Sequence, residues 1–495
     1  MSSARVRVPI LLFLGSLLMQ AAWILAVPPF RGSDEFDHAY RAAAVADGQW
    51  KPEYVSAENG RGELLVVPRG LVEAAKPICE SYEYTGHDNC NPVSDEGDGE
   101  VAVASAAARY HPAFYWLIGA PAKTFDGASA LYVMRISNAL VCSLMIALAG
   151  WAAALSARSR WPLVGVLAAM TPVAVYSTAV PAPNGIEMAA GLALWTSLLG
   201  LPRALSQKGE RLLLAVAIPS AAVLAGVRQL GPLWLALIVL TVVGAIGLGR
   251  TWLLLRRHRN MLLFGSAIVA AAGLTNAWWT LSAGSLESGR NLELSDPLTN
   301  SFVQLPLWFF QAIAAFPVRN DSAPVVVYAV GSLVFAGLVT VGIKAADRRL
   351  RLSLIATILL AAAVPFCITF MTFSERGAEW QGRYGLPFSF GVLVLAATAL
   401  ETVNLRHRLV GPALMAGGLA LTIAHTVSVV DVLITERHGS PLSGDPAWVM
   451  PQPWIVAALM IMGWMAWAMA ALRQVPVDSE AREPATDTRT RVSTH

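Results

Sequence analysis

The amino-acid sequence predicts an all-α polytopic membrane protein with about 12 transmembrane helices. Of its 495 residues, 55% are hydrophobic and only 14% are charged, whereas soluble domains carry about 25% charged residues. Many stretches reach the roughly 20 apolar residues that are needed to cross a bilayer. Basic residues recur at the turns on one side, for example Arg158 and Arg160, as the positive-inside rule requires. A single soluble core is therefore excluded.

The net charge is small. The chain has 36 Lys and Arg residues against 33 Asp and Glu residues, which gives +3. No block of Lys and Arg is long enough to track a phosphate backbone. We therefore expect no nucleic-acid partner.

The first span is predicted within residues 1–28, where Arg5 and Arg7 precede an apolar run of about 20 residues. This run is longer than the core of a typical signal peptide, so we interpret it as a retained helix. Eleven further spans are predicted at residues 129–156, 162–180, 185–201, 211–227, 232–249, 261–282, 324–343, 352–373, 386–403, 409–433 and 453–472. The multi-span domain would cover residues 129–473 and include an outer loop at 283–323. Both termini would then lie in the cytoplasm, with a disordered tail at residues 474–495.

Residues 29–128 form a long extracytoplasmic loop in this interpretation. Its length and polarity predict a small folded cap with interfacial helices. Cys79 and Cys90 flank the polar stretch CESYEYTGHDNC within it. In an oxidising compartment they would form a disulfide worth about 3 kcal/mol. A metal pair is the alternative, although no second Cys/His pair completes a zinc site.

The densest ionisable cluster follows the first span, where Asp34, Glu35, Asp37 and His38 occupy five positions. Ser33 could cap a helix whose first turn holds Asp34 and Glu35. At helical spacing, Asp34, Asp37 and His38 also share one face. Two carboxylates and an imidazole on one face suit general base catalysis or metal binding.

The segment RYHPAFYWLIGAP, residues 109–121, is apolar but too short to cross a bilayer. Its aromatic residues, among them Tyr115, suit a helix that lies at the membrane interface. His111 could instead face a phosphate or the acidic cluster. Structural anchoring and substrate binding therefore both remain open for this segment.

Four arginines are predicted near the outer face of the membrane. A charge at membrane depth costs about 2.5 to 3.5 kcal/mol on insertion scales, so these side chains need partners. Glu187 is one candidate partner, and an anionic lipid phosphate, which suits the planar guanidinium, is another. Snorkelling to the surface is the alternative. The four are Arg135, Arg228, Arg319 and Arg383, the last with Tyr384 beside it in EWQGRYGLP.

Four motifs together resemble bacterial membrane proteins of the domain of unknown function 2142 family. They are the acidic pair after the first span, the HPxFYW segment, LYxxRISNAL in the second span and a late QGRYGLP. That family in turn resembles the GT-C glycosyltransferases, among them the protein O-mannosyltransferases. The run from Tyr110 to Trp116 is similar to the K/H-P-P-L-x-Y-W stretch of those transferases, with Ala113 in place of the second proline.

The resemblance implies a GT-C-like fold and an acidic residue at the reaction centre in the first outer loop. That position corresponds to Asp34, with Glu35 beside it. The implied donor is a polyprenyl-phosphate sugar, and the implied acceptor is a glycan or lipid of the cell envelope. Asp34 would act as the base in an inverting displacement, and outer-face arginines would neutralise the phosphate. A divalent metal ion held by Asp34, Glu35 or His38 is left open.

Two other functions compete with this interpretation. A flippase or polysaccharide exporter would need a continuous polar path through the spans, along Glu187, Asn276 and His425. A non-catalytic assembly subunit would leave Asp34 and His38 solvated on a convex surface. In all three cases the protein would reside in the cell membrane.

Overall fold

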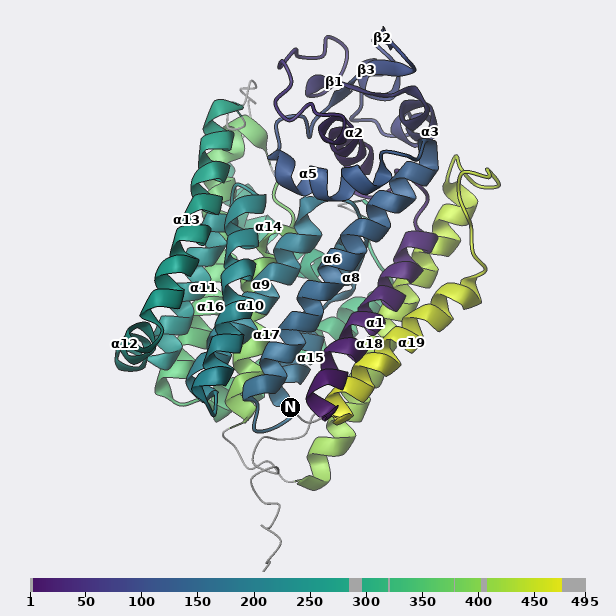
Figure 1. Cartoon of the computed structure of the whole chain (residues 1–495). Helices are drawn as coiled ribbons and strands as arrows, with labels where there is room; N and C mark the ends of the chain where they lie inside the picture. Colours follow the sequence, from purple (N-terminus) through teal and green to yellow (C-terminus); the bar gives the residue numbers. More distant parts are fainter. Residues whose placement is uncertain (1–2, 285–295, 319–320, 378, 402–406, 474–495) are drawn as a thin grey trace, which may run out of the picture.

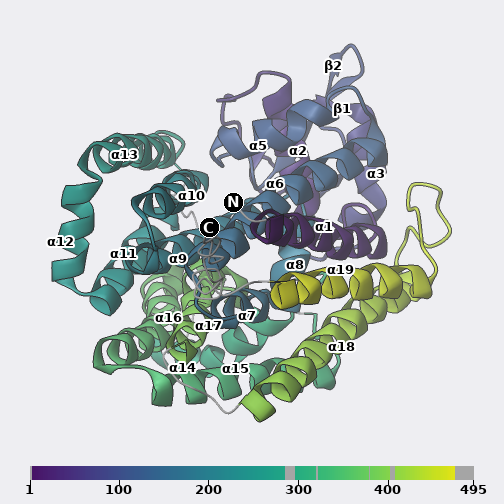
Figure 2. The same cartoon turned by 60° about the horizontal axis from the view of Figure 1, so that its bottom comes forward.

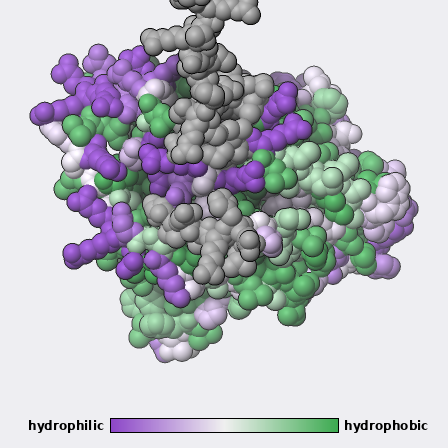
Figure 3. Space-filling model, turned by 90° about the horizontal axis from the view of Figure 1, so that it is seen from below, coloured by the Kyte–Doolittle hydropathy of each residue, from purple (hydrophilic) through white to green (hydrophobic). Residues whose placement is uncertain are grey.

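The computed structural model describes residues 3–284, 296–318, 321–377, 379–401 and 407–473. A bundle of long helices forms the body of the molecule, and a smaller cap covers one end of it (Figure 1). The start of α1 lies at the other end of the bundle. Figure 3 views this opposite end and shows many hydrophilic side chains there. The tail at residues 474–495, predicted to be disordered, lies outside the described residues.

The bundle confirms the predicted polytopic, helical fold. Ten of the described helices are long and apolar enough to cross a membrane, or up to twelve if each of two bent pairs counts as one span. Its helices are α1 (Ser3–Ala26), α6 (Gly127–Ser156), α7 (Trp161–Ala169), α8 (Pro172–Ala179), α9 (Pro183–Gly200), α10 (Gln207–Val227), α11 (Gly231–Ile246), α12 (Leu248–Arg257), α13 (Arg259–Ser282), α14 (Pro297–Ile313), α15 (Val325–Ala345), α16 (Arg348–Arg376), α17 (Leu386–Leu400), α18 (His407–Gly439) and α19 (Pro453–Arg473), with short 3-10 helices η2 (Leu201–Arg203) and η3 (Gly382–Gly385).

Two predicted spans are bent. The span predicted at 162–180 is divided into α7 and α8, which meet at 67°. Pro172 lacks an N–H and disfavours a helical conformation at Thr171, so the helix breaks there. The span predicted at 232–249 ends with α11, because Gly247 has φ +86, and α12 leaves at 109°. No residue of α12 is buried and its last turn is basic, as suits a helix lying on a membrane surface.

The segment predicted as an outer loop, residues 283–323, contains the apolar helix α14. It packs against α16, η3 and α8. In the view of Figure 2, α12 and α13 lie at one edge of the molecule and α18 and α19 at another. Helices α9 and α17 contact each other, and both are buried along almost their whole length.

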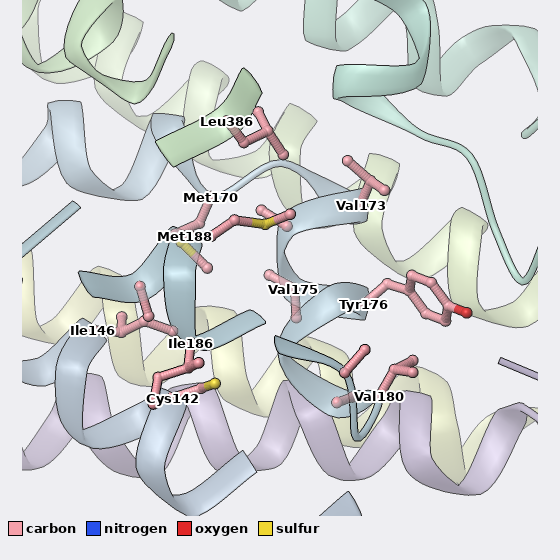
Figure 4. Packing of buried hydrophobic residues seen from close by; sticks show 14 of the residues in the cluster. Cys142, Ile146, Met170, Val173, Val175, Tyr176, Val180, Ile186, Met188 and Leu386 are labelled. Atoms are coloured by element: carbon pink, nitrogen blue, oxygen red, sulfur yellow. The ribbon is translucent and has the colours of Figure 1, made fainter. Parts of the chain in front are cut away.

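Helix α8, the second half of a broken span, lies inside the bundle, where it packs against α1, α6, α9 and α14. Figure 4 shows Val173, Val175 and Tyr176 of α8 with Cys142 and Ile146 of α6 and Ile186 and Met188 of α9. The last carbonyls of α8, which have no helical partner, accept hydrogen bonds from Asn138 Nδ2 at Thr178 and Val180. Gln20 Nε2 donates to the Thr178 hydroxyl. Inside a membrane such groups must be satisfied by protein. These bonds therefore fix the end of α8, which leads directly to the candidate site.

The cap combines short helices with a small sheet. Its elements are α2 (Glu35–Ala46), β1 (Glu63–Pro68), α3 (Arg69–Cys79), α4 (His87–Cys90), β2 (Ser94–Gly97), β3 (Glu100–Ser105), α5 (Pro112–Gly119) and η1 (Ala120–Ala122). The strands are antiparallel in the order β1-β3-β2. The sequence predicted interfacial helices in this cap and gave no prediction of strands. Cys79 and Cys90 form a disulfide that joins α3 to α4, with their Cα atoms 5.4 Å apart.

Candidate active site

A pocket lies where the cap meets the bundle. Polar and aromatic side chains dominate its lining. The lining residues are Ser33, Asp34, His38, Tyr110, Tyr176, Ser177, Val180, Ala182, Asn184, Arg228, Arg383 and Tyr384.

Asp34 contributes the accessible carboxylate of this pocket. It stands at the position before α2 in a left-handed conformation, φ 53 and ψ 25, which aspartate tolerates better than most residues. Its side chain is 46% exposed and lies 3.9 Å from the Arg383 guanidinium. The carboxylate is thus close to a cation and still open to a ligand.

Ser33 holds Arg383 in place and does not cap α2. Arg383 Nη1 donates to the Ser33 hydroxyl at 2.8 Å, and that hydroxyl donates to the Pro317 carbonyl. The Tyr176 hydroxyl accepts from the Ser33 N–H and donates to the same carbonyl. The predicted helix-capping role of Ser33 is therefore wrong, because its hydroxyl is engaged by Arg383 and Pro317.

Arg228 supplies a second cation. Its Nη1 donates to Glu187 at 3.1 Å, which is the partner considered from the sequence. The Arg228 guanidinium lies 4.8 Å from the centre of the Tyr384 ring, and the Arg383 guanidinium lies 5.5 Å from it. One aromatic ring thus holds two guanidinium groups near each other, and among the described residues only Arg228 has a carboxylate within normal hydrogen-bond reach.

His38 presents a neutral imidazole to the pocket. Its Nδ1 shares a hydrogen bond of 2.8 Å with the Tyr115 hydroxyl. Burial lowers the pKa of His38 to about 4, an effect that Asp34 only partly opposes. Tyr115 itself does not line the pocket and acts through His38.

Asp37 lies beneath the pocket and not in its wall. Its Oδ1 accepts a hydrogen bond of 2.6 Å from the Ala106 N–H, and its backbone carbonyl accepts one from Ser105. Burial, together with the charge of Asp34, raises the pKa of Asp37 to about 7. The structure therefore assigns Asp37 to the support of α2 rather than to ligand contact.

Glu35 is bound to Arg135 in a fully buried ion pair. Nε and Nη2 of Arg135 donate to the two carboxylate oxygens, each at 2.7 Å. Arg135 also donates to the carbonyls of Ile24, Val27 and Pro28 at the end of α1. Glu35 is 0% exposed, so the catalytic role expected for it is replaced by a structural one, and the ligand role expected for Arg135 likewise.

The order of these elements along the chain matches a known family. A family model described as "Predicted membrane protein (DUF2142)" matches residues 17–393. The chain belongs to this family. The matched range includes all four motifs on which the resemblance was based, from the acidic cluster to QGRYGLP.

Two further comparisons add little to this DUF2142 assignment. The search of curated proteins gave no match. Among solved structures, the chain is similar to ArnT from Cupriavidus metallidurans in the apo state, with 14% identity and a TM-score of 0.38. The likeness covers 88% of this chain and 75% of that one. Function must therefore be argued from the pocket of the DUF2142 protein itself.

Some expected site residues lie elsewhere. His111 packs edge-on against Trp279, with ring centres 5.6 Å apart, and is absent from the pocket lining. Arg319 lies outside the described residues. Within the described ranges, no group of three or more His, Cys, Asp or Glu side chains is placed to hold a metal ion. The metal set considered from the sequence is not assembled, because Glu35 is bound to Arg135.

Residues at the junction of α8 and α9 were missed by the sequence analysis. Tyr176 and Ser177 were placed inside a membrane span and Asn184 in the turn after it, yet all three line the pocket. The signal was present in VPAPNG, where Pro181 and Pro183 interrupt an apolar stretch and a polar residue follows. Proline at membrane depth is tolerated where the broken backbone lines a cavity or is buried in protein.

The polar residues that an exporter would need make local contacts in this DUF2142 protein. Glu187 is paired with Arg228. Asn276 donates to the backbone carbonyls of Ala225 and Arg228. His425 packs against Trp464, with ring centres 5.1 Å apart, and is fully buried. Glu187 and Asn276 thus both contact Arg228, whereas His425 has a separate aromatic contact.

We predict that Arg135→Ala strongly destabilises the protein. Removing one partner of a buried pair costs about 3 to 5 kcal/mol because the other charge is left unpaired. The matched control is Arg69→Ala, which breaks the exposed pair with Asp95 and should cost at most about 1 kcal/mol. Thermal unfolding in detergent measures both. Equal melting temperatures for the two variants would contradict the role assigned to the buried pair.

We also predict that Asp37→Asn changes how stability depends on pH. The raised pKa means that the folded state binds the Asp37 proton more tightly than the unfolded chain does. The contribution of Asp37 to the stability of the wild type should therefore fall as pH rises from about 4 to about 7, by on the order of 4 kcal/mol. The variant lacks this titration, so its melting temperature minus that of the wild type should increase as pH rises across that range. A constant difference between pH 4 and pH 8 would refute the assignment.

Proposed function

We propose that this protein is a membrane glycosyltransferase that moves a sugar from a polyprenyl-phosphate donor to a cell-envelope acceptor. The observation that carries the proposal is the pairing of an accessible carboxylate, Asp34, with two guanidinium groups in one pocket at the membrane end of the cap. A carboxylate can take a proton from an acceptor hydroxyl. Guanidinium groups can neutralise the phosphate that leaves.

Three groups would bind the phosphate of the donor. Arg383 and Arg228 offer planar donor sets that suit phosphate oxygens. Asn184 adds a side-chain amide whose Nδ2 has no hydrogen-bond partner among the described residues. It stands in the first turn of α9, where free N–H groups and the helix dipole favour an anion.

The reaction would be a single inverting displacement. The acceptor oxygen attacks the anomeric carbon while its proton passes to the Asp34 carboxylate. The bond between that carbon and the phosphate oxygen breaks, and polyprenyl phosphate leaves as an anion paired with Arg383 and Arg228. No general acid is needed, because a phosphate leaves readily. His38, which is neutral, would donate or accept a hydrogen bond without adding charge.

The proposal places the cap on the extracytoplasmic side of the cell membrane and both termini in the cytoplasm. The basic residues on the face opposite the cap support this orientation through the positive-inside rule. The donor would enter from the lipid, and the acceptor would approach from the water beside the cap. The ion pair of Glu187 with Arg228 and the burial of His425 against Trp464 favour an enzyme over an exporter.

We predict that Asp34→Asn lowers transfer at least about 100-fold, the usual effect of losing a general base. Asparagine also tolerates the left-handed backbone at this position, so the fold should persist. The assay follows transfer of labelled sugar from polyprenyl-phosphate donors to cell-envelope fractions.

The matched control is Asp98→Asn, an exposed cap residue that also has positive φ, 51. This variant should keep wild-type activity, and both variants should elute as folded protein. Activity within about threefold of wild type in Asp34→Asn would remove Asp34 as the base.

A further inference from the structure

The Asp34 side chain is partly exposed to water, and the proposed phosphate site accounts only for the part of it that faces Arg383. In an inverting displacement the attacking oxygen and the leaving phosphate lie on opposite sides of the anomeric carbon. If Arg228 and Arg383 bind the phosphate, the acceptor must arrive past Asp34 from the cap. The inference below therefore rests on the proposed function.

The cap carries a stacked row of two guanidinium groups and two aromatic rings, which we call the ladder: Arg31, Tyr82, Tyr84 and Arg61. The Arg31 guanidinium lies 5.3 Å from the centre of the Tyr82 ring. Tyr82 stacks on Tyr84 with ring centres 5.0 Å apart. The Arg61 guanidinium lies 5.2 Å from the centre of the Tyr84 ring. Tyr84 is 38% exposed, and Arg61 is exposed as well.

The ladder is close to Asp34. The Tyr82 hydroxyl donates to the Arg31 carbonyl, three residues before Asp34. The Tyr82 ring packs on Phe36, two residues after it, with ring centres 6.1 Å apart. Burial and the negative charges of Asp34 and Asp37 raise the pKa of Tyr84. The phenol thus lies within the electrostatic reach of both carboxylates.

The two loops that carry Tyr84 and Arg61 are held together. The disulfide between Cys79 and Cys90 closes the loop of Tyr84. Asn89, inside that loop, accepts from the Arg61 N–H and donates to the Arg61 carbonyl. Asp88 accepts from the Asn59 N–H at 2.8 Å. This frame fixes the base of the Arg61 side chain.

The Arg61 guanidinium stacks on the Tyr84 ring, and Arg61 forms no ion pair with another described residue. Arg31, at the other end of the ladder, is paired with Glu436 at 2.9 Å. An exposed guanidinium stacked on a ring is suited to a phosphate or carboxylate. The Tyr84 hydroxyl beside it can hydrogen-bond to a hydroxyl group.

We propose that Arg61 and Tyr84 form the acceptor subsite and select a polyhydroxylated acceptor that carries an anionic group. The anionic group can be the carboxylate of an acidic sugar or a phosphate diester or monoester of an envelope polymer. Arg61 binds it on the water side of Asp34. The acceptor hydroxyl then lies toward the carboxylate that removes its proton.

The test measures binding of small probes to the full chain in nanodiscs. The probes are methyl β-D-glucuronide, sn-glycerol 3-phosphate and the neutral methyl β-D-glucoside. We expect wild type to bind at least one anionic probe about tenfold more tightly than the glucoside. The anionic probe that binds more tightly shows whether the acceptor carries a carboxylate or a phosphate. Arg61→Gln should abolish this preference. Arg69→Gln, which alters another exposed cap arginine, should keep it.

Equal affinity for charged and neutral probes in wild type, or an unchanged preference in Arg61→Gln, would overturn the proposal. Asp34→Asn separates it from the proposed function, because acceptor binding should survive the loss of the base. If Asp34→Asn keeps full transfer while Arg61→Gln loses the preference, the base assignment fails and the acceptor subsite stands.

Discussion

Arg135 ties the end of the first membrane helix to the first helix of the cap. Its guanidinium bonds to both oxygens of Glu35, to the Ile24 carbonyl in the last turn of α1 and to the carbonyls of Val27 and Pro28 directly after it. The Gly32 N–H donates to Glu35 as well. Both charges are buried, so neither can be lost without leaving the other unpaired. The turn between α1 and α2, which carries Ser33 and Asp34, is fixed from both ends by this pair.

The same pair explains why adjacent carboxylates have different properties. Glu35 is neutralised by Arg135 and cannot reach a ligand. Asp37 is buried against Ala106, and its pKa rises to about 7. Asp34, which precedes both in sequence, keeps a side chain that is almost half exposed and lies 3.9 Å from the Arg383 guanidinium. The surroundings of the three acids thus give Glu35 a structural role, let Asp37 support α2, and leave Asp34 free to act on a substrate.

The sequence predicted the membrane helices well because hydrocarbon thickness sets their length and composition. It also brought Asp34, His38, Arg228, Arg383 and Tyr384 forward as candidates, and the structure gathers all five in one pocket. It could not predict which acid would be paired, since Glu35 and Arg135 are 100 residues apart in sequence. The residues at the α8–α9 junction were missed because Pro181 and Pro183 indicate a break in the helix but not whether that break lines a pocket. The small sheet was missed because its strands are only four to six residues long.

The most direct test of this account is the accessibility of position 34. Asp34→Cys is made in a chain whose free cysteines, Cys142 and Cys367, are replaced by alanine. A membrane-impermeant maleimide is then added to intact spheroplasts, with and without polyprenyl phosphate. The account predicts labelling from outside that slows when polyprenyl phosphate is present, because that lipid headgroup binds beside Arg383 and Arg228. Labelling only after the membrane is opened, or labelling at the same rate with the lipid, would contradict it.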